Sequence, residues 1–197
     1  MDAHLRAGAA VYNEGEYHGA HDAWEDQWLD LESGTDDERL LHGLIQFTAA
    51  VFHARKRNWL GAVGLANSGR EYLRELPGDY RGVNVRTTRS YLADLEADPE
   101  RIERARPPAL TIDGEALRYD DLRFDAAAVA AGVLAAEYGY DESLLEQAAA
   151  YARQDLANGK TNSLLVTLVL DFLRTDDQRA IVYKRLEQGV QRRCESS

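Results

Sequence analysis

Apolar residues recur at helical spacing along most of the chain, with polar residues between them. The four prolines all lie between these periodic segments, which fits because proline interrupts the interior of a helix. The pattern predicts an all-α fold. The expected helices span residues 3–13, 16–31, 36–57, 59–76, 85–96, 125–137, 141–158, 162–174 and 175–192.

Two of the predicted helices begin with a similar motif. The sequence Tyr-His-Gly-Ala at residues 17–20 is matched by Trp-Leu-Gly-Ala at residues 59–62, in each case after a short turn. Small residues at such positions allow antiparallel helices to approach closely. The repeat therefore favours a bundle of helical hairpins, with the arrangement of tetratricopeptide repeats as one alternative.

The pattern changes between residues 104 and 123, where two prolines precede short apolar runs on either side of Asp113-Gly114. An Asp-Gly pair between alternating apolar residues is the signature of a two-residue β-hairpin. We therefore expect three parts. An N-terminal helical core would span residues 1–98, a connector with a short hairpin 99–123, and a C-terminal helical extension, packed on the core, 124–197.

The charge balance is strongly acidic. The chain has 34 Asp and Glu residues against 23 Lys and Arg, and its formal net charge is −11. This balance disfavours binding to nucleic acid, which depends on Lys and Arg to neutralise phosphates. Only three of the basic residues are lysine. An acidic, lysine-poor composition resembles that of proteins from salt-loving archaea, where salt screens self-repulsion, although an acidic protein of a GC-rich genome is the alternative.

The sequence contains no charge-free stretch of the ~20 residues that span a bilayer, and no basic segment followed by an apolar one at its start. Its single cysteine, Cys194, can form neither an internal disulfide nor a thiolate metal cluster. These features predict a cytoplasmic protein without a membrane segment. Its partner stays open among a peptide, a small ligand and a second copy of the chain.

All five histidines lie within the first 53 residues. On a helical projection, His21 and Glu25 fall within the aromatic, core-facing stripe of the second predicted helix. The third predicted helix is apolar nearly all round, but His42, Gln46 and His53 lie on one narrow polar stripe. Because buried polar groups require hydrogen-bond partners, we expect the two stripes to face each other. The side chains expected to converge are His21, Glu25, Gln46 and His53.

Several of these residues belong to a longer motif. Tyr-x-x-Ala-His-x-x-x-Glu-x-x-Trp runs from Tyr17 to Trp28, Gly-Leu-Ile-Gln follows at 43–46, and His53 precedes Asn-x-x-Gly-Ala at 58–62. Together they resemble the family of small α-helical proteins known as domain of unknown function 309. The resemblance covers about residues 8–76 and implies an all-α core without an established activity. In that family a glycine commonly precedes the asparagine, whereas this chain has Arg57.

Three functions fit these residues. In the first, a non-catalytic protein uses a buried polar network to fix the register of two helices. The candidates for this network, or for a binding site, are His21, Glu25, Trp28, Gln46 and His53. In the second, the protein binds a peptide or small ligand in an aromatic groove. That groove would be lined by Tyr12, Tyr17, Trp24, Trp28 and Trp59.

The third function is a metal-dependent enzyme of the hydrolase type. Two imidazoles and one carboxylate, from His21, His53 and Glu25, could bind zinc or iron and leave one position open for water. The second helix lacks the additional carboxylate of di-iron bundles, and no phosphate-binding or nucleophile motif occurs in the sequence. Zinc or iron is expected only if the protein is such an enzyme. If either of the first two functions is correct, we expect no cofactor.

Overall fold

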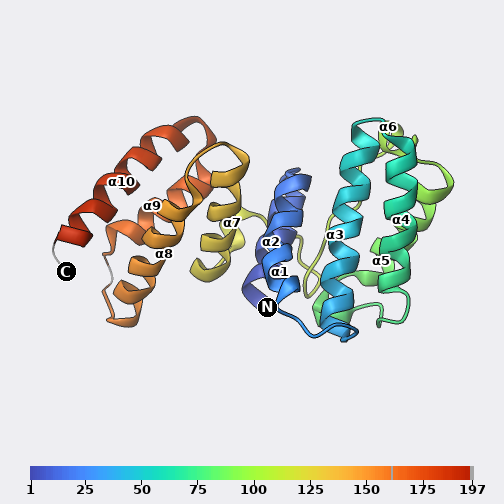
Figure 1. Ribbon diagram of the computed structural model, residues 1–197, viewed down its shortest axis with the longest axis horizontal. Helices are drawn as coiled ribbons and strands as arrows, with labels where there is room; N and C mark the ends of the chain where they lie inside the picture. The colour runs from blue at the N-terminus through green and yellow to red at the C-terminus, as the bar shows by residue number, and fades with distance from the viewer. Residues whose placement is uncertain (161, 196–197) are drawn as a thin grey trace. The chain divides into compact units, whose positions relative to one another are not determined.

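The computed structural model describes residues 1–160 and 162–195, and the chain divides into two compact units, residues 1–118 and residues 119–197 (Figure 1). Both units consist of helices, so the all-α prediction is confirmed. No strand longer than an isolated β-bridge occurs in the described residues. In the same part of the chain, no helix combines the length and apolar character needed to cross a bilayer.

Unit 1 contains five long helices and one short helix. Each of the first five helices packs against the next one along the chain, and α3 and α4 run side by side (Figure 1). The helices are α1 (Asp2–Asn13), α2 (Tyr17–Leu29), α3 (Asp36–Arg55), α4 (Trp59–Leu73), α5 (Val85–Ala97) and α6 (Arg101–Arg104). The sequence pattern did not predict α6. Buried residues lie on nearly every side of α3, as expected from its sequence.

The ends of α3 follow from local hydrogen bonds. At its start, Thr35 accepts a hydrogen bond from the backbone N–H of Glu38 (3.3 Å), so the cap lies one residue before the acidic run. At its end, Arg57 adopts the left-handed conformation with φ of 60°. The backbone N–H groups of Arg57 and Asn58 donate to the carbonyls of Ala54 and His53, both at 2.9 Å. This is the Schellman arrangement, which glycine adopts without strain.

The connector folds back onto unit 1 instead of separating two domains. The Asn13 side chain at the end of α1 donates to the carbonyls of Leu110 and Leu117 (both 2.9 Å). It also accepts a hydrogen bond from the backbone N–H of Leu110 (2.9 Å). The first unit therefore ends near Arg118, and not at residue 98 as the sequence pattern predicted.

The Asp113-Gly114 pair forms the tight turn that its sequence predicted. Both residues have positive φ (55° and 84°), as a type I′ turn requires. Ile112 and Glu115 exchange two backbone hydrogen bonds of 2.9 and 3.0 Å. The pairing is limited to isolated bridges, one of them between Ile112 and Val83.

Unit 2 is a smaller helical bundle around Leu168, Phe172 and Leu186, which are buried. Asp141 caps α8 by accepting a hydrogen bond from the backbone N–H of Ser143 (3.0 Å). A 3₁₀ turn delays the start of the last helix beyond the predicted residue 175. The long helices are α7 (Phe124–Glu137), α8 (Glu142–Ala157), α9 (Leu164–Arg174) and α10 (Arg179–Glu195). Residues 161, 196 and 197 of the predicted extension lie outside the described residues.

Candidate functional site

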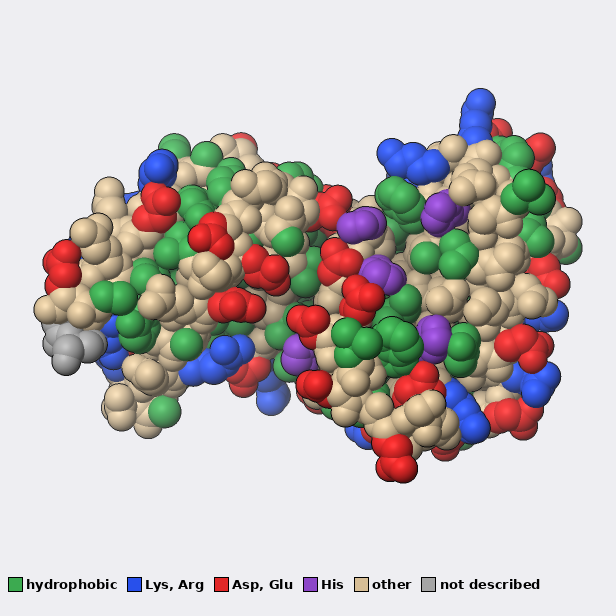
Figure 2. Space-filling view, in the orientation of Figure 1, with side chains coloured by type: hydrophobic (Ala, Val, Ile, Leu, Met, Phe, Trp, Pro, Cys, Tyr) green, Lys and Arg blue, Asp and Glu red, His purple; other side chains and the backbone are tan. Residues whose placement is uncertain are grey.

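Histidine and acidic side chains gather on one face of unit 1 (Figure 2). On α2, the His21 Nδ1 lies 2.9 Å from the Asp22 Oδ1 and 4.0 Å from the Glu25 Oε2. The hydrogen bond to Asp22, opposed in part by burial, raises the pKa of His21, and the Glu25 charge adds to the effect. His21 and Glu25 therefore interact as expected, but Asp22, which the projection placed towards solvent, is the closer partner.

His53 and Gln46 take other partners. Asn58 Nδ2 donates a hydrogen bond to His53 Nδ1 (2.8 Å) across the turn that ends α3. Gln46 faces α4, because a Cβ on Gly69 would lie only 3.1 Å from the Gln46 Cβ. Among the described residues, no hydrogen bond joins His21 or Glu25 to Gln46 or His53.

The predicted network of four buried side chains is therefore wrong in its composition. The Glu25 side chain is 45% exposed and that of His21 30% exposed, so neither is buried between two helices. The structure groups His21 and Glu25 with Asp22 within ligand distance, and His53, which the sequence added to this metal set, is not in that group. The helical projection gave the direction of each polar stripe. It could not give the helix that each stripe faces, because α3 is buried on several sides and its polar side chains can contact more than one neighbouring helix.

A polar junction between α2 and α3 does exist, and Trp28 belongs to it. Trp28 Nε1 donates to the Glu38 Oε1 (2.9 Å), and His42 Nδ1 lies 3.2 Å from the same oxygen. The backbone N–H of Gly34 donates to the other carboxylate oxygen (3.2 Å). The His42 ring stacks on Tyr72 of α4, with ring centroids 3.7 Å apart. One carboxylate thus fixes the loop between α2 and α3, and the imidazole extends the junction to α4.

Glu38 is ionised at this junction. Its side chain is only 11% exposed. Burial alone would raise the pKa of Glu38, but the three donors around its carboxylate outweigh that effect, and the pKa lies below its ordinary value. Sequence reasoning missed Glu38 because acidic residues are common in the first turn of a helix. The signal that could have found it is the Glu38-x-x-x-His42 spacing, which places both side chains on one face.

The predicted aromatic groove is wrong for two of its five members. Trp24 is fully buried, and its indole packs so closely on α1 that a Cβ at Gly8 would lie 2.2 Å from it. Tyr12 is 2% exposed and donates a hydrogen bond to the carbonyl of Pro108 (3.0 Å). Both are core side chains. Tyr17, Trp28 and Trp59 are half-buried.

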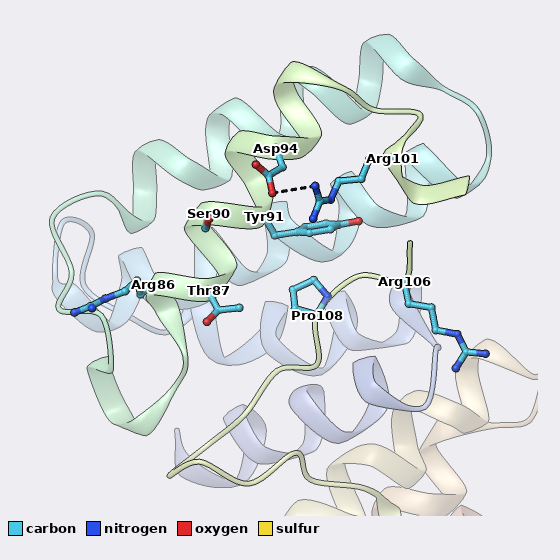
Figure 3. Close-up of a pocket in the computed structure, with 8 residues that line it drawn as sticks. All are labelled: Arg86, Thr87, Ser90, Tyr91, Asp94, Arg101, Arg106 and Pro108. Atoms are coloured by element: carbon cyan, nitrogen blue, oxygen red, sulfur yellow. Dashed lines mark ion pairs between the residues drawn. The ribbon is translucent and has the colours of Figure 1, made fainter. Parts of the chain in front are cut away.

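A pocket of about 440 Å³ lies elsewhere in unit 1, along α5 and the start of the connector (Figure 3). In Figure 3 the Arg101 guanidinium lies beside the Tyr91 ring, 5.7 Å from its centroid, and forms an ion pair with Asp94 at 3.3 Å. The lining residues are Arg86, Thr87, Ser90, Tyr91, Asp94, Arg101, Arg106 and Pro108. This pocket was not predictable from the helical pattern, because the connector brings Arg101, Arg106 and Pro108 to α5.

Two polar groups in the pocket wall lack protein partners. The Tyr91 hydroxyl and the Arg101 Nε are buried, and neither has a hydrogen-bond partner among the described residues. Tyr91 as a whole is 4% exposed. Burial, opposed by the charge of Arg101, raises the pKa of Tyr91 to about 12, so the hydroxyl is protonated at neutral pH. Two hydrogen-bond donors are thus buried in residues that line the pocket, without a partner among the described residues.

Two further cations stand at the ends of the pocket. Arg86 and Arg106 are exposed, and in Figure 3 their guanidinium groups extend away from Tyr91. Neither side chain forms an ion pair or hydrogen bond with another described residue. Against these two and Arg101 the lining has one acidic residue, Asp94, so it carries a net charge of about +2.

Comparison with known proteins concerns the first third of the chain. The model of a family described as a domain of unknown function (DUF309) matches residues 5–65. The match runs from α1 into α4 and includes His21, Trp28 and Gln46, so the resemblance inferred from the sequence motifs is confirmed. No curated protein matches the chain. The pocket along α5 lies outside the matched residues.

Proposed function

We propose that this protein is a binding module for a small anion, and that the pocket along α5 holds the ligand. The observation that carries the proposal is the buried Tyr91 hydroxyl, a protonated donor without a partner among the described residues, beside the Arg101 guanidinium in a pocket that Arg86 and Arg106 also line. The sequence also suggested a small-ligand function, but in an aromatic groove. The present proposal assigns that function to the residues of the pocket along α5.

The energetic argument starts from the two unused donors. A buried polar group left without a hydrogen bond costs ~1–3 kcal/mol. An oxyanion that reached these two buried groups through the pocket wall would accept hydrogen bonds from the Tyr91 hydroxyl and the Arg101 Nε and so remove that cost on binding. Hydrogen bonds to a charged acceptor are also stronger than those between neutral groups. The wall therefore favours an anion over a neutral ligand of the same size.

The charge of the lining points to the same class of ligand. A cationic pocket in a protein of net charge −11 is a local reversal of the overall field. Arg86 and Arg106 are exposed and have no partner among the described residues, so either guanidinium could bind an anion without breaking an ion pair. A guanidinium binds phosphate and carboxylate groups in a bidentate manner.

The volume of about 440 Å³ suits a metabolite rather than a macromolecule, because small-molecule pockets typically hold ~300–1,000 Å³. Thr87 and Ser90 on α5 add hydroxyls to the lining and can orient a polar ligand. The ligand class that fits is a small phosphorylated or carboxylated compound.

The test is isothermal titration calorimetry of the full chain with inorganic phosphate and, separately, succinate, at one fixed salt concentration. We expect saturable binding of at least one probe, and the stronger one identifies the anionic group. In the double variant Arg86→Gln/Arg106→Gln, affinity should fall by about ten-fold or more, because each charge-assisted hydrogen bond contributes ~1.5–3 kcal/mol.

The matched control is Arg185→Gln on α10, an exposed arginine that also lacks an ion pair among the described residues. It removes one positive charge from the protein and none from the pocket, so affinity should stay within about two-fold of the wild type. Absence of saturable binding by both probes contradicts the proposal. Equal losses in the double variant and the control contradict it as well, because they indicate a non-specific charge effect.

We also propose that the protein works in the cytoplasm of a salt-loving cell. The support is compositional: 34 acidic residues against 23 basic ones, with arginine in place of lysine at all but three positions. Self-repulsion of this kind is relieved when salt shortens the Debye length to ~3 Å at 1 M. The melting temperature should therefore rise from dilute buffer to molar potassium chloride. A melting temperature that stays constant or falls contradicts this proposal.

A further inference from the structure

A second pocket, of about 470 Å³, lies between α4 and α5. It shares Arg86 and Ser90 with the pocket along α5, and both residues are drawn in Figure 3. At ~100° per residue these two side chains form one row along the helix, with Tyr91 on one side of the row and Arg89 on the other. The two pockets therefore adjoin along this row. The other charged residues that line the second pocket are Arg70, Glu71, Arg74 and Arg89.

Arg89 supplies a fixed positive charge to the second pocket. Its Nη1 donates to three backbone carbonyls at the end of α4, those of Leu73, Arg74 and Leu76, at 2.7–3.1 Å. These hydrogen bonds hold the guanidinium in place, whereas its Nε and Nη2 donate to no other described residue. In the described part of the chain, Arg89 also forms no ion pair. An anion in the second pocket can therefore bind this guanidinium without displacing a carboxylate.

The other two arginines of the second pocket form ion pairs close to solvent. Arg70 pairs with Glu96 at 3.1 Å, and Arg74 pairs with Glu71 at 2.7 Å and with Glu75 at 2.9 Å. The Arg74 side chain is 64% exposed. Exposed ion pairs contribute little to stability, because water and salt screen them. A phosphate can therefore replace these carboxylates at small cost.

The charge of the combined lining indicates how many anionic groups the ligand carries. Six arginines and two acidic residues line the two pockets together, which gives a net charge of about +4. A phosphate monoester carries about −1.5 to −2 at neutral pH, so two phosphates balance most or all of this charge, whereas one balances at most half of it. From this balance and from the shared row we propose that the ligand is a small bisphosphorylated metabolite, with one phosphate in each pocket. The inference rests on the proposed anion-binding function and narrows its ligand class.

The test compares fructose 1,6-bisphosphate with fructose 6-phosphate, which share one sugar and differ by one phosphate, and includes inorganic phosphate. Isothermal titration calorimetry of the full chain, at one fixed salt concentration, should give one equivalent of bisphosphate per chain. Its affinity should exceed that of the monophosphate by about ten-fold or more, because the second phosphate binds at a high effective concentration. If inorganic phosphate binds but the bisphosphate binds no more tightly than the monophosphate, this inference is wrong and the anion-binding function stands. If no phosphate probe and no succinate binds, both are wrong.

The variant that tests the second pocket is Arg74→Gln. It should lower the ratio of bisphosphate to monophosphate affinity by about ten-fold, because it removes a charge-assisted hydrogen bond that only the second phosphate makes. The matched control is Arg39→Gln, which removes an exposed arginine that pairs with Asp36 three residues before it, as Arg74 does with Glu71, but lines neither pocket. In the control the ratio should stay within about two-fold of the wild type. An unchanged ratio in Arg74→Gln, or an equal fall in both variants, would overturn the placement of a phosphate in the second pocket.

Discussion

The indole nitrogen of Trp28 donates a hydrogen bond to the carboxylate of Glu38, with 2.9 Å between Nε1 and Oε1. Trp28 lies in the last turn of α2 and Glu38 in the first turn of α3, so the bond joins the two helices across their loop. The backbone of Gly34, within the loop, donates to the same carboxylate. Glu38 therefore links α2 to α3 by hydrogen bonds, the role that the sequence pattern predicted for His21 and Gln46.

This relationship predicts that Trp28→Phe and Glu38→Gln each destabilise the protein. Each change leaves a buried donor or acceptor without its partner, which costs ~1–3 kcal/mol, and the double variant should cost less than the sum. Chemical denaturation measures both terms. The comparison cycle is His21→Ala with Gln46→Ala, which should be additive because the structure gives these side chains different neighbours. Additivity in the first cycle, or strong coupling in the second, would contradict the structure.

The same carboxylate predicts a dependence of stability on pH. The pKa of Glu38 is lowered in the folded protein, so its contribution to stability is fully present above the unfolded-state pKa of about 4.3. The contribution is lost as pH falls through the lower folded-state pKa. The difference in unfolding free energy between wild type and Glu38→Gln should therefore shrink in acid. Urea denaturation at pH 7 and pH 3 measures it, and a constant difference would exclude an ionised Glu38.

The turn after α3 predicts a stabilising substitution. Arg57 has φ of 60°, a conformation that costs a residue with a Cβ roughly 1 kcal/mol relative to glycine. Arg57 also forms an exposed ion pair with Glu103 at 2.7 Å. The clean comparison is therefore Arg57→Gly against Arg57→Ala, since both lack the ion pair. The glycine variant should be more stable by ~1 kcal/mol in chemical denaturation, and an alanine variant of equal stability would show that the turn is unstrained.

Periodicity predicted the helices because burial of one helix face is a local property of sequence. The helix starts at Tyr17 and Trp59 coincide with the repeated motif, and the Asp113-Gly114 turn follows from the positive φ that both residues tolerate. Hydrogen bonds shift other boundaries by two residues: the turn at Arg57 ends α3 at Arg55, and the Ser163 cap starts α9 at Leu164.

The candidate site was less predictable, because a projection gives the direction of a side chain but not the neighbour it meets. Gln46 faces α4, where Gly69 leaves room for it. The pocket along α5 depends on a contact between distant parts of the chain, since Asn13 holds the connector at Leu110 and Leu117. No periodic pattern encodes that contact, and so Arg101 and Arg106 carry no signal in the sequence.

The most direct test of the anion pocket is the variant Tyr91→Phe, which removes one hydroxyl and keeps the buried ring. Because that hydroxyl has no partner among the described residues, the unfolding free energy should stay the same within about 0.5 kcal/mol, or rise. The affinity for the anionic probe that binds the wild type more tightly should fall by roughly ten-fold or more, since a hydrogen bond to a charged group contributes ~1.5–3 kcal/mol. Unchanged affinity together with lowered stability would contradict the account.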